Sequence, residues 1–103
     1  MTEKGGTVER GGWTYIMTNR PRGVLYIGVT AHLAQRVDQN RRGEGSAFCR
    51  RYGIDRLVLA EPHEEIAYAI AREKPLKAWR RAWKIELIEA TNPTWRDLFL
   101  ELA

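Results

Sequence analysis

Cysteine is nearly absent from this chain. Among 103 residues the sequence has one cysteine, Cys49, which excludes an internal disulfide and a zinc site made of several cysteines. Long apolar runs are missing too, since no stretch reaches the roughly 18 residues that a membrane-spanning helix needs. The N-terminus has no hydrophobic signal segment. We therefore expect a cytoplasmic protein that does not associate with membranes.

The composition is that of an ordinary globular domain. Hydrophobic residues make up 44% of the chain and charged residues 29%, so the chain is too apolar to be disordered. A length of 103 residues suits a single domain of common size. The formal net charge of +4 favours a polyanionic partner, and nucleic acid is the usual one.

The N-terminal part predicts a flexible leader followed by a β-hairpin. Residues 1–12 contain four glycines and little that could be buried, so we expect the folded domain to cover 13–103. Strand composition at 13–18 and 24–30 flanks turn-forming residues. We expect an even loop, which puts Tyr15 and Tyr26 on one face, as a simple aromatic pair or as part of a site; an odd loop would put them on opposite faces.

Glycine inside the second of these strands has two possible explanations. Gly28 follows Tyr26 by two residues and so shares its face. It marks either a close approach by a ligand or another backbone, or a bulge.

The middle of the chain predicts a helix, a basic loop and a third strand. Thr30 is the expected N-cap of a helix that buries Leu33 and Val37. At the edge of that stripe, Arg36 could extend into solvent or hold a phosphate. A third strand is predicted at 54–61, with Leu57 and Leu59 on one face; Pro62 ends it.

The segment 41–53 combines basic and aromatic residues. Its arginines surround Phe48 and Tyr52, a pattern that suits a nucleic-acid backbone with occasional base stacking. The alternative is a solvated loop whose two aromatic rings are anchored in the core. Its candidate contacts to nucleic acid are Arg41, Arg42, Arg50 and Arg51.

The C-terminal part predicts a long helix that begins at His63 and is kinked or restarted at Pro75. A further helix should end near Glu89. Asn92 and Pro93 then have the pattern of an N-cap followed by a first-turn proline, which would begin a short terminal helix. His32 and His63 lack partners at any motif spacing, and we expect both at the surface.

Glu73 is the only acid between residues 72 and 84, where six residues are basic. Helical spacing places it on the same stripe as Ile70, which should lead into the core. Glu73 either binds a metal ion beside a polyanion or pairs with Lys77 at i+4. Lys77 and Lys84 join the candidate contacts to nucleic acid.

Five motifs in order resemble the GIY-YIG nuclease superfamily. The closest similarity is to its short stand-alone bacterial branch, related to the nuclease subunit of structure-selective endonucleases, and it runs from about Trp13 to Leu98. The motifs are Trp13-Thr14-Tyr15-Ile16, Leu25-Tyr26-Ile27-Gly28-Val29-Thr30, Leu33-Ala34-Gln35-Arg36-Val37, Ala71-Arg72-Glu73-Lys74 and Asn92-Pro93-Thr94-Trp95.

This resemblance implies an α+β fold, with a small three-stranded antiparallel sheet flanked by helices in the order β-β-α-β-α-α. It also implies a set of catalytic residues, with Gly28 beside them at the substrate. The matching catalytic positions are Tyr15, Tyr26, Arg36, Glu73 and Asn92.

The implied reaction is divalent-metal-dependent hydrolysis of DNA, selective for branched or flapped structures and used in DNA repair or recombination. Glu73 would hold one Mg²⁺ or Mn²⁺ ion. Arg36 would neutralise the phosphoryl charge. Tyr15 or Tyr26 would orient or deprotonate water, with a nearby cation lowering its pKa. RNA is not excluded as a substrate.

Two other interpretations remain open. Many relatives have histidine where Asn40 stands, and a helix-compatible residue at Pro75, so a nucleic-acid-binding module with weak catalysis is the alternative. The third interpretation is an adaptor that docks a partner through Trp79 or Trp95. With one cysteine the chain cannot form the zinc module of structure-selective relatives, so an unknown targeting partner is compatible with the nuclease as well.

Overall fold

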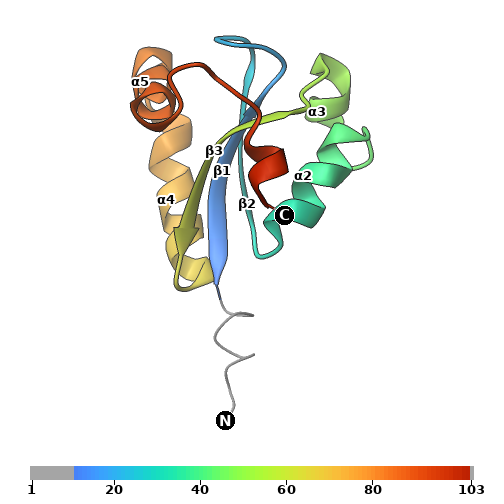
Figure 1. The fold of residues 1–103 in the computed structure, drawn as a ribbon. Coiled ribbons are helices and arrows are strands. Elements are labelled where there is room, and N and C mark those ends of the chain that lie inside the picture. The colour runs from blue at the N-terminus through green and yellow to red at the C-terminus, as the bar shows by residue number, and fades with distance from the viewer. Residues whose placement is uncertain (1–10, 103) are drawn as a thin grey trace.

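Three antiparallel strands and the helices around them form the fold, as predicted (Figure 1). The structure is a computed structural model that describes residues 11–102. The expected leader lies outside the described residues except for Gly11 and Gly12. The elements are β1 (Gly12–Thr18), β2 (Leu25–Thr30), α2 (Leu33–Arg41), α3 (Ala47–Tyr52), β3 (Arg56–His63), α4 (Ile66–Ala78), α5 (Arg81–Thr91) and the 3₁₀ helix η1 (Leu98–Leu102).

The sheet has the order β2-β1-β3 and lies between two helical layers. Figure 1 shows α4 and α5 on one side of the sheet and α2 and α3 on the other. Tyr15 and Met17 point into the cluster formed with α2, α3 and η1. Ile16 points into the cluster formed with α4 and α5. Because both faces are covered, the central strand β1 is buried along nearly its whole length.

The hairpin has the even register that the sequence predicts. Tyr15 pairs with Gly28 and Met17 pairs with Tyr26, so all four residues share one face. The two tyrosines are therefore diagonal neighbours across β1 and β2. The prediction that they lie on the same face is confirmed.

In the third strand, the prediction that Leu57 and Leu59 share one face is wrong. Ile16 pairs with Leu59 and Met17 pairs with Leu57, which leaves Val58 as an extra residue opposite β1. This irregularity sends Leu57 and Leu59 to different clusters. The strand also continues through Pro62 to His63, which an edge strand tolerates because the proline needs no donor on its open side.

Helix boundaries account for several corrections. The prediction that Thr30 is the N-cap of α2 is wrong: His32 holds that position and the helix begins at Leu33. The hydroxyl oxygen of Thr30 accepts a hydrogen bond from the His32 backbone N–H at 3.0 Å. The helix α4 begins at Ile66 rather than at His63, which belongs to β3. It continues through Pro75 to Ala78 instead of restarting at the proline, and α5 begins after a short break. Within residues 11–102, none of the helices is long and apolar enough to cross a membrane.

A short helix, α3, occupies residues 47–52 of the segment 41–53 that was predicted as a basic loop. Ser46 caps α3, since its hydroxyl oxygen accepts from the backbone N–H groups of Phe48 and Cys49. Gly53 ends the helix with a φ of 63°, a left-handed conformation that glycine adopts without strain. This turn of chain positions the aromatic side chains that line part of the site.

Candidate functional site

Tyr15 of β1 and Tyr26 of β2, the two tyrosines of the predicted site, pack against each other. Their ring centroids are 6.3 Å apart, and Tyr15 is completely buried. A Cβ at Gly28 would lie 2.5 Å from the Tyr15 hydroxyl oxygen. Gly28 is therefore required to make room for the Tyr15 ring. The pairing of β1 with β2 has no register shift there, so the bulge interpretation of Gly28 is wrong.

The hydroxyl group of Tyr15 lacks a hydrogen-bond partner, alone among the buried side-chain polar atoms of residues 11–102. Asn40 lies nearby but uses its amide elsewhere. Its Nδ2 donates to the Met17 sulfur at 3.6 Å, and its Oδ1 accepts from the Ser46 backbone N–H at 2.9 Å. An unpaired buried hydroxyl costs free energy.

Burial, together with the neighbouring Tyr26, raises the pKa of Tyr15 to about 12. Arg36 and Asn40 act in the opposite direction, because they favour the phenolate. The loss of hydration outweighs them. The cation beside Tyr15 thus fails to produce the lowered pKa that the sequence suggested. At neutral pH Tyr15 keeps its proton and can act as a hydrogen-bond donor.

Arg36 is exposed on α2, between the buried Leu33 and Val37. It lines a surface pocket of about 210 Å³ together with Thr30, His32, Gln35 and Gln39. Among the described residues, none of the ion pairs includes Arg36. A planar guanidinium in this setting is suited to bidentate contact with phosphate.

Glu73 lies at the border of the buried stripe of α4. That stripe contains Ala69 and Leu76, whereas Ile70 is 49% exposed, so the predicted stripe was wrong at Ile70. The Glu73 side chain retains 21% exposure and pairs with the Lys77 amino group at 3.1 Å. The i+4 ion pair is therefore present. Within 11–102 no three histidine, cysteine or acidic side chains cluster as a metal site.

A pocket of about 280 Å³ links the two sides of the sheet; we call it the β2-edge pocket. Leu25 and Ile27 of β2 face the α4 side, whereas Tyr26 faces the α3 side. The pocket therefore spans the free edge of β2, and Lys77 connects it to Glu73. Its lining residues are Leu25, Tyr26, Ile27, Phe48, Lys77 and Lys84.

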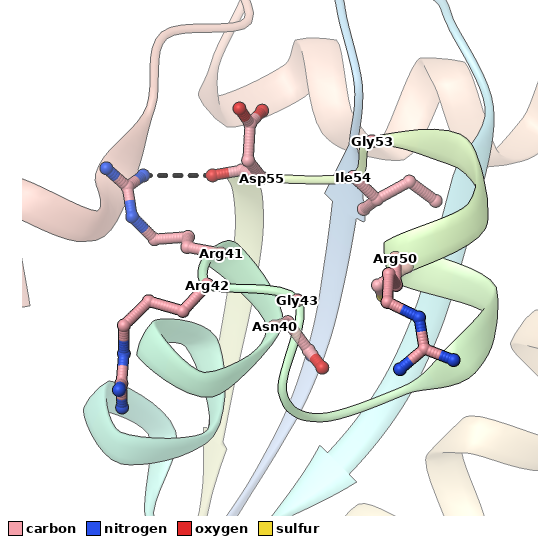
Figure 2. A pocket seen from close by; sticks show the side chains of 9 residues that line it. Asn40, Arg41, Arg42, Gly43, Arg50, Gly53, Ile54 and Asp55 are labelled. Carbon is pink, nitrogen blue, oxygen red and sulfur yellow. Dashed lines mark hydrogen bonds between the residues drawn. The ribbon is translucent and has the colours of Figure 1, made fainter.

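The four arginines of the α2–α3 segment do not form one binding surface. Arg41 donates to the Asp55 carbonyl at 2.9 Å, pairs with Asp97 and lies 4.5 Å from the Phe99 ring centroid. Figure 2 shows Arg41 reaching toward Asp55 while Arg42 points away from Arg50.

Arg42 pairs with Asp38 and Glu44, each at about 3 Å. Because of these contacts, Arg41 and Arg42 mainly stabilise the fold. Arg50 and Arg51 make no ion pair within the described part of the chain.

Phe48 and Tyr52 are not anchored in the core, so the alternative prediction of a solvated loop held by these two rings is wrong. Each is 41% exposed, and their ring centroids are 4.8 Å apart. The Phe48 ring also lies 6.0 Å from that of Tyr26. Their i, i+4 spacing, with the buried Cys49 between them, is the sequence signal for this shared outer face.

Asn92 lies away from the pocket, at the C-cap of α5 rather than at a helix start. Its Nδ2 donates to the carbonyl oxygens of Val58 at 3.3 Å and Arg96 at 2.9 Å. Its Oδ1 accepts from the Arg96 backbone N–H at 3.1 Å and guanidinium at 3.2 Å. The side chain is 1% exposed and fully engaged. We call these contacts the Asn92 network.

The adaptor interpretation requires Trp79 or Trp95 to be exposed, and the structure does not support this for Trp95. Trp95 is 2% exposed, and its indole N–H donates to Glu89 at 2.7 Å. It cannot dock a partner. Trp79 is half-buried, whereas the neighbouring Trp83 is 47% exposed.

Comparison with known proteins completes the description of the site. Residues 11–86 match the family model of the GIY-YIG catalytic domain. A UPF0213 protein of Sodalis glossinidius is 31% identical over 72 residues, which cover 70% of this chain and 67% of the relative. UPF0213 proteins of Staphylococcus aureus strains Mu3 and N315 are 31% identical over 67 residues, 65% of this chain and 82% of each relative. No solved structure gives a significant match.

Proposed function

The chain belongs to the GIY-YIG catalytic domain family, and on this premise we propose that it is a divalent-metal-dependent endonuclease that hydrolyses DNA. The observation that carries the proposal is the β2-edge pocket. It brings the half-buried Tyr26 to two lysines, one of which contacts Glu73. A pocket with cations and a carboxylate beside it suits a phosphodiester and the ion that activates it.

Glu73 is the residue that would hold the metal. Mg²⁺ and Mn²⁺ commonly bind through one or two carboxylates and complete their coordination with water and substrate phosphate. A single, partly exposed carboxylate fits such an ion, although it does not fit a site enclosed by protein. When bound, the ion supplies positive charge to the scissile phosphate and the leaving 3′ oxygen.

Lys77 must release the Glu73 carboxylate before the metal binds. An i, i+4 pair on a helix surface is worth only about 0.2–0.5 kcal/mol. The Lys77 side chain is 58% exposed and flexible enough to turn toward a phosphate instead. The observed ion pair is thus compatible with both interpretations of Glu73.

Arg36 and the two tyrosines divide the remaining tasks. Arg36 binds a phosphate oxygen and stabilises the charge that develops on the phosphoryl group. Tyr26, which lines the pocket, orients the attacking water. Tyr15 holds the Tyr26 ring in place and donates a hydrogen bond, since its raised pKa makes it a poor base. Asn92 contributes by fixing the C-terminal segment against β3.

The finer description follows the same resemblance. We propose branched or flapped DNA as the substrate, contacts from Arg50, Arg51, Lys77 and Lys84, and a role in DNA repair or recombination in the cytoplasm. RNA is the second candidate substrate, and a targeting protein is a candidate partner. The alternative is a binding module with weak catalysis, with which the Glu73–Lys77 pair is also compatible.

A cleavage assay separates the two functions. Labelled single-stranded, duplex, flapped and branched DNA are incubated with Mg²⁺, Mn²⁺ or EDTA, and wild type is compared with Glu73→Ala. The nuclease gives product only with metal, and the variant loses at least about a hundredfold in rate while it keeps DNA binding and its melting temperature. Binding without product under every metal condition would establish the alternative.

A further inference from the structure

Three aromatic rings form a continuous row from the β2-edge pocket onto the surface; we call Tyr26, Phe48 and Tyr52 the aromatic ladder. The ring centroids are 6.0 Å apart for the first pair and 4.8 Å apart for the second. The ladder starts at the tyrosine that lines the candidate cleavage site and ends on α3. Phe48 and Tyr52 are each 41% exposed.

The outer two rings are not needed for the packing of α3. Cys49 is the residue that α3 buries, and it belongs to the core cluster together with Ile54. Ser46 caps the start of the helix and Gly53 ends it. The helix is thus specified without Phe48 or Tyr52, which leaves their exposed faces without a structural explanation.

Basic side chains lie beside the aromatic ladder. The Arg51 guanidinium carbon lies 5.4 Å from the Tyr52 ring centroid. Lys77 and Lys84 line the pocket together with Phe48, and they are the two charged residues of its lining. An aromatic row with cations on its flank matches a nucleic-acid strand, whose bases stack on the rings while its phosphates meet the cations.

The geometry favours unpaired bases over a duplex. The faces of paired bases are covered by their neighbours in the stack, and only an unpaired or extruded base offers its face to a protein ring. The rings of the ladder already touch one another at these distances. A base therefore lies on the outer faces of Phe48 and Tyr52 rather than between them.

We propose that the aromatic ladder is a binding subsite for single-stranded DNA, which stacks unpaired bases on Phe48 and Tyr52 next to the phosphate in the β2-edge pocket. The position of that phosphate rests on the proposed function, whereas the stacking does not. In a flapped or branched substrate, the ladder would take the unpaired strand.

Binding without metal tests the subsite separately from cleavage. A fluorescein-labelled single strand of about 12 nucleotides and the same sequence as a blunt duplex are titrated with protein in EDTA, and anisotropy gives each Kd. We expect the single strand to bind more tightly. A strand that binds in EDTA but is never cut with metal would remove the proposed catalysis and leave the subsite in place.

Leucine variants isolate the contribution of the rings. Phe48→Leu and Tyr52→Leu keep apolar volume on an exposed face, so melting temperatures should match wild type. Each should weaken single-strand binding at least about fivefold, with a smaller effect on the duplex. Tyr68→Leu is the matched control, because Tyr68 is a 56% exposed aromatic on α4 outside the ladder; it should leave both affinities unchanged.

A second readout detects stacking directly. A strand that carries 2-aminopurine should change its fluorescence on binding to wild type, and this change should shrink in both ladder variants. Equal affinity for strand and duplex, unchanged affinity in the ladder variants, or an equal loss in Tyr68→Leu would overturn the subsite.

Discussion

Tyr15 and Asn92 are both buried polar residues of the same domain, yet their surroundings are opposite. Asn92 is 1% exposed, and its side chain takes part in four hydrogen bonds that join α5, β3 and the C-terminal segment. Tyr15 is 0% exposed, and its hydroxyl makes none. A satisfied group stabilises a fold, whereas an unsatisfied buried group costs free energy.

The contrast extends to the regions around the two residues. Near Asn92, charged side chains are engaged: Asp97 accepts from the backbone N–H groups of Leu57 and Phe99 and pairs with Arg41. These bonds, Arg41 included, lower the pKa of Asp97 although burial acts to raise it. Around the β2-edge pocket, aromatic faces and cations remain exposed. The Asn92 side thus builds the fold, whereas the β2 edge is where we propose that the chemistry takes place.

The largest effect on stability should come from Asn92→Ala. This change leaves the Val58 carbonyl and the Arg96 backbone N–H without their buried partner, which should lower the free energy of unfolding by about 2–4 kcal/mol. Denaturant titration measures it. Asn92→Asp is the control, since it keeps an acceptor for Arg96 and should lose less than the alanine variant. A loss below about 1 kcal/mol would mean that the Asn92 network does not hold the C-terminal segment.

Alkaline pH should lower the stability of the fold through Tyr15. The pKa of Tyr15 is raised from 10.0 to about 12 by burial, so stability is independent of this group below pH 10. Between pH 10 and 12 the unfolded chain loses the proton while the folded protein keeps it, and the free energy of unfolding should fall by an amount on the order of 2 kcal/mol. Denaturant titration across this range checks the slope.

Tyr15→Phe provides the matched control and a smaller effect of its own. The variant should lose the fall in unfolding free energy that Tyr15 causes between pH 10 and 12, and absorbance titration should lose the tyrosine that ionises near pH 12. At neutral pH, removing an unpaired hydroxyl should leave stability unchanged or raise it by about 1 kcal/mol, while cleavage slows. Marked destabilisation at pH 7 would show that the hydroxyl has a structural partner after all.

Sequence patterns predicted the parts of the fold that local chemistry determines. The turn residues between two strand-like segments predicted the hairpin, and the even register that we expected for it is confirmed. The buried pair Leu33 and Val37 identified the inner face of α2. Two motifs that the resemblance matched, those of Tyr15 and Tyr26, meet in the structure as expected.

What the sequence could not predict depends on long-range contacts. Leu57, Val58 and Leu59 are all apolar, so composition gives no sign of the extra residue in β3. An Asn-Pro pair suits either side of a helix boundary, and only the packing of α5 on β3 decides for the C-cap. The unpaired state of the Tyr15 hydroxyl depends on how α2 and β1 meet.

The most direct test of the contrast between the Asn92 network and the β2-edge pocket is the Mg²⁺-dependent cleavage rate of Glu73→Gln and Asn92→Ala. The two rates are compared per folded molecule at a temperature where both variants are native. The account predicts that Glu73→Gln loses cleavage and keeps wild-type stability, whereas Asn92→Ala loses stability and keeps a rate within about tenfold of wild type. Retained cleavage in Glu73→Gln, or its complete loss in folded Asn92→Ala, would contradict the assignment of chemistry to the β2 edge.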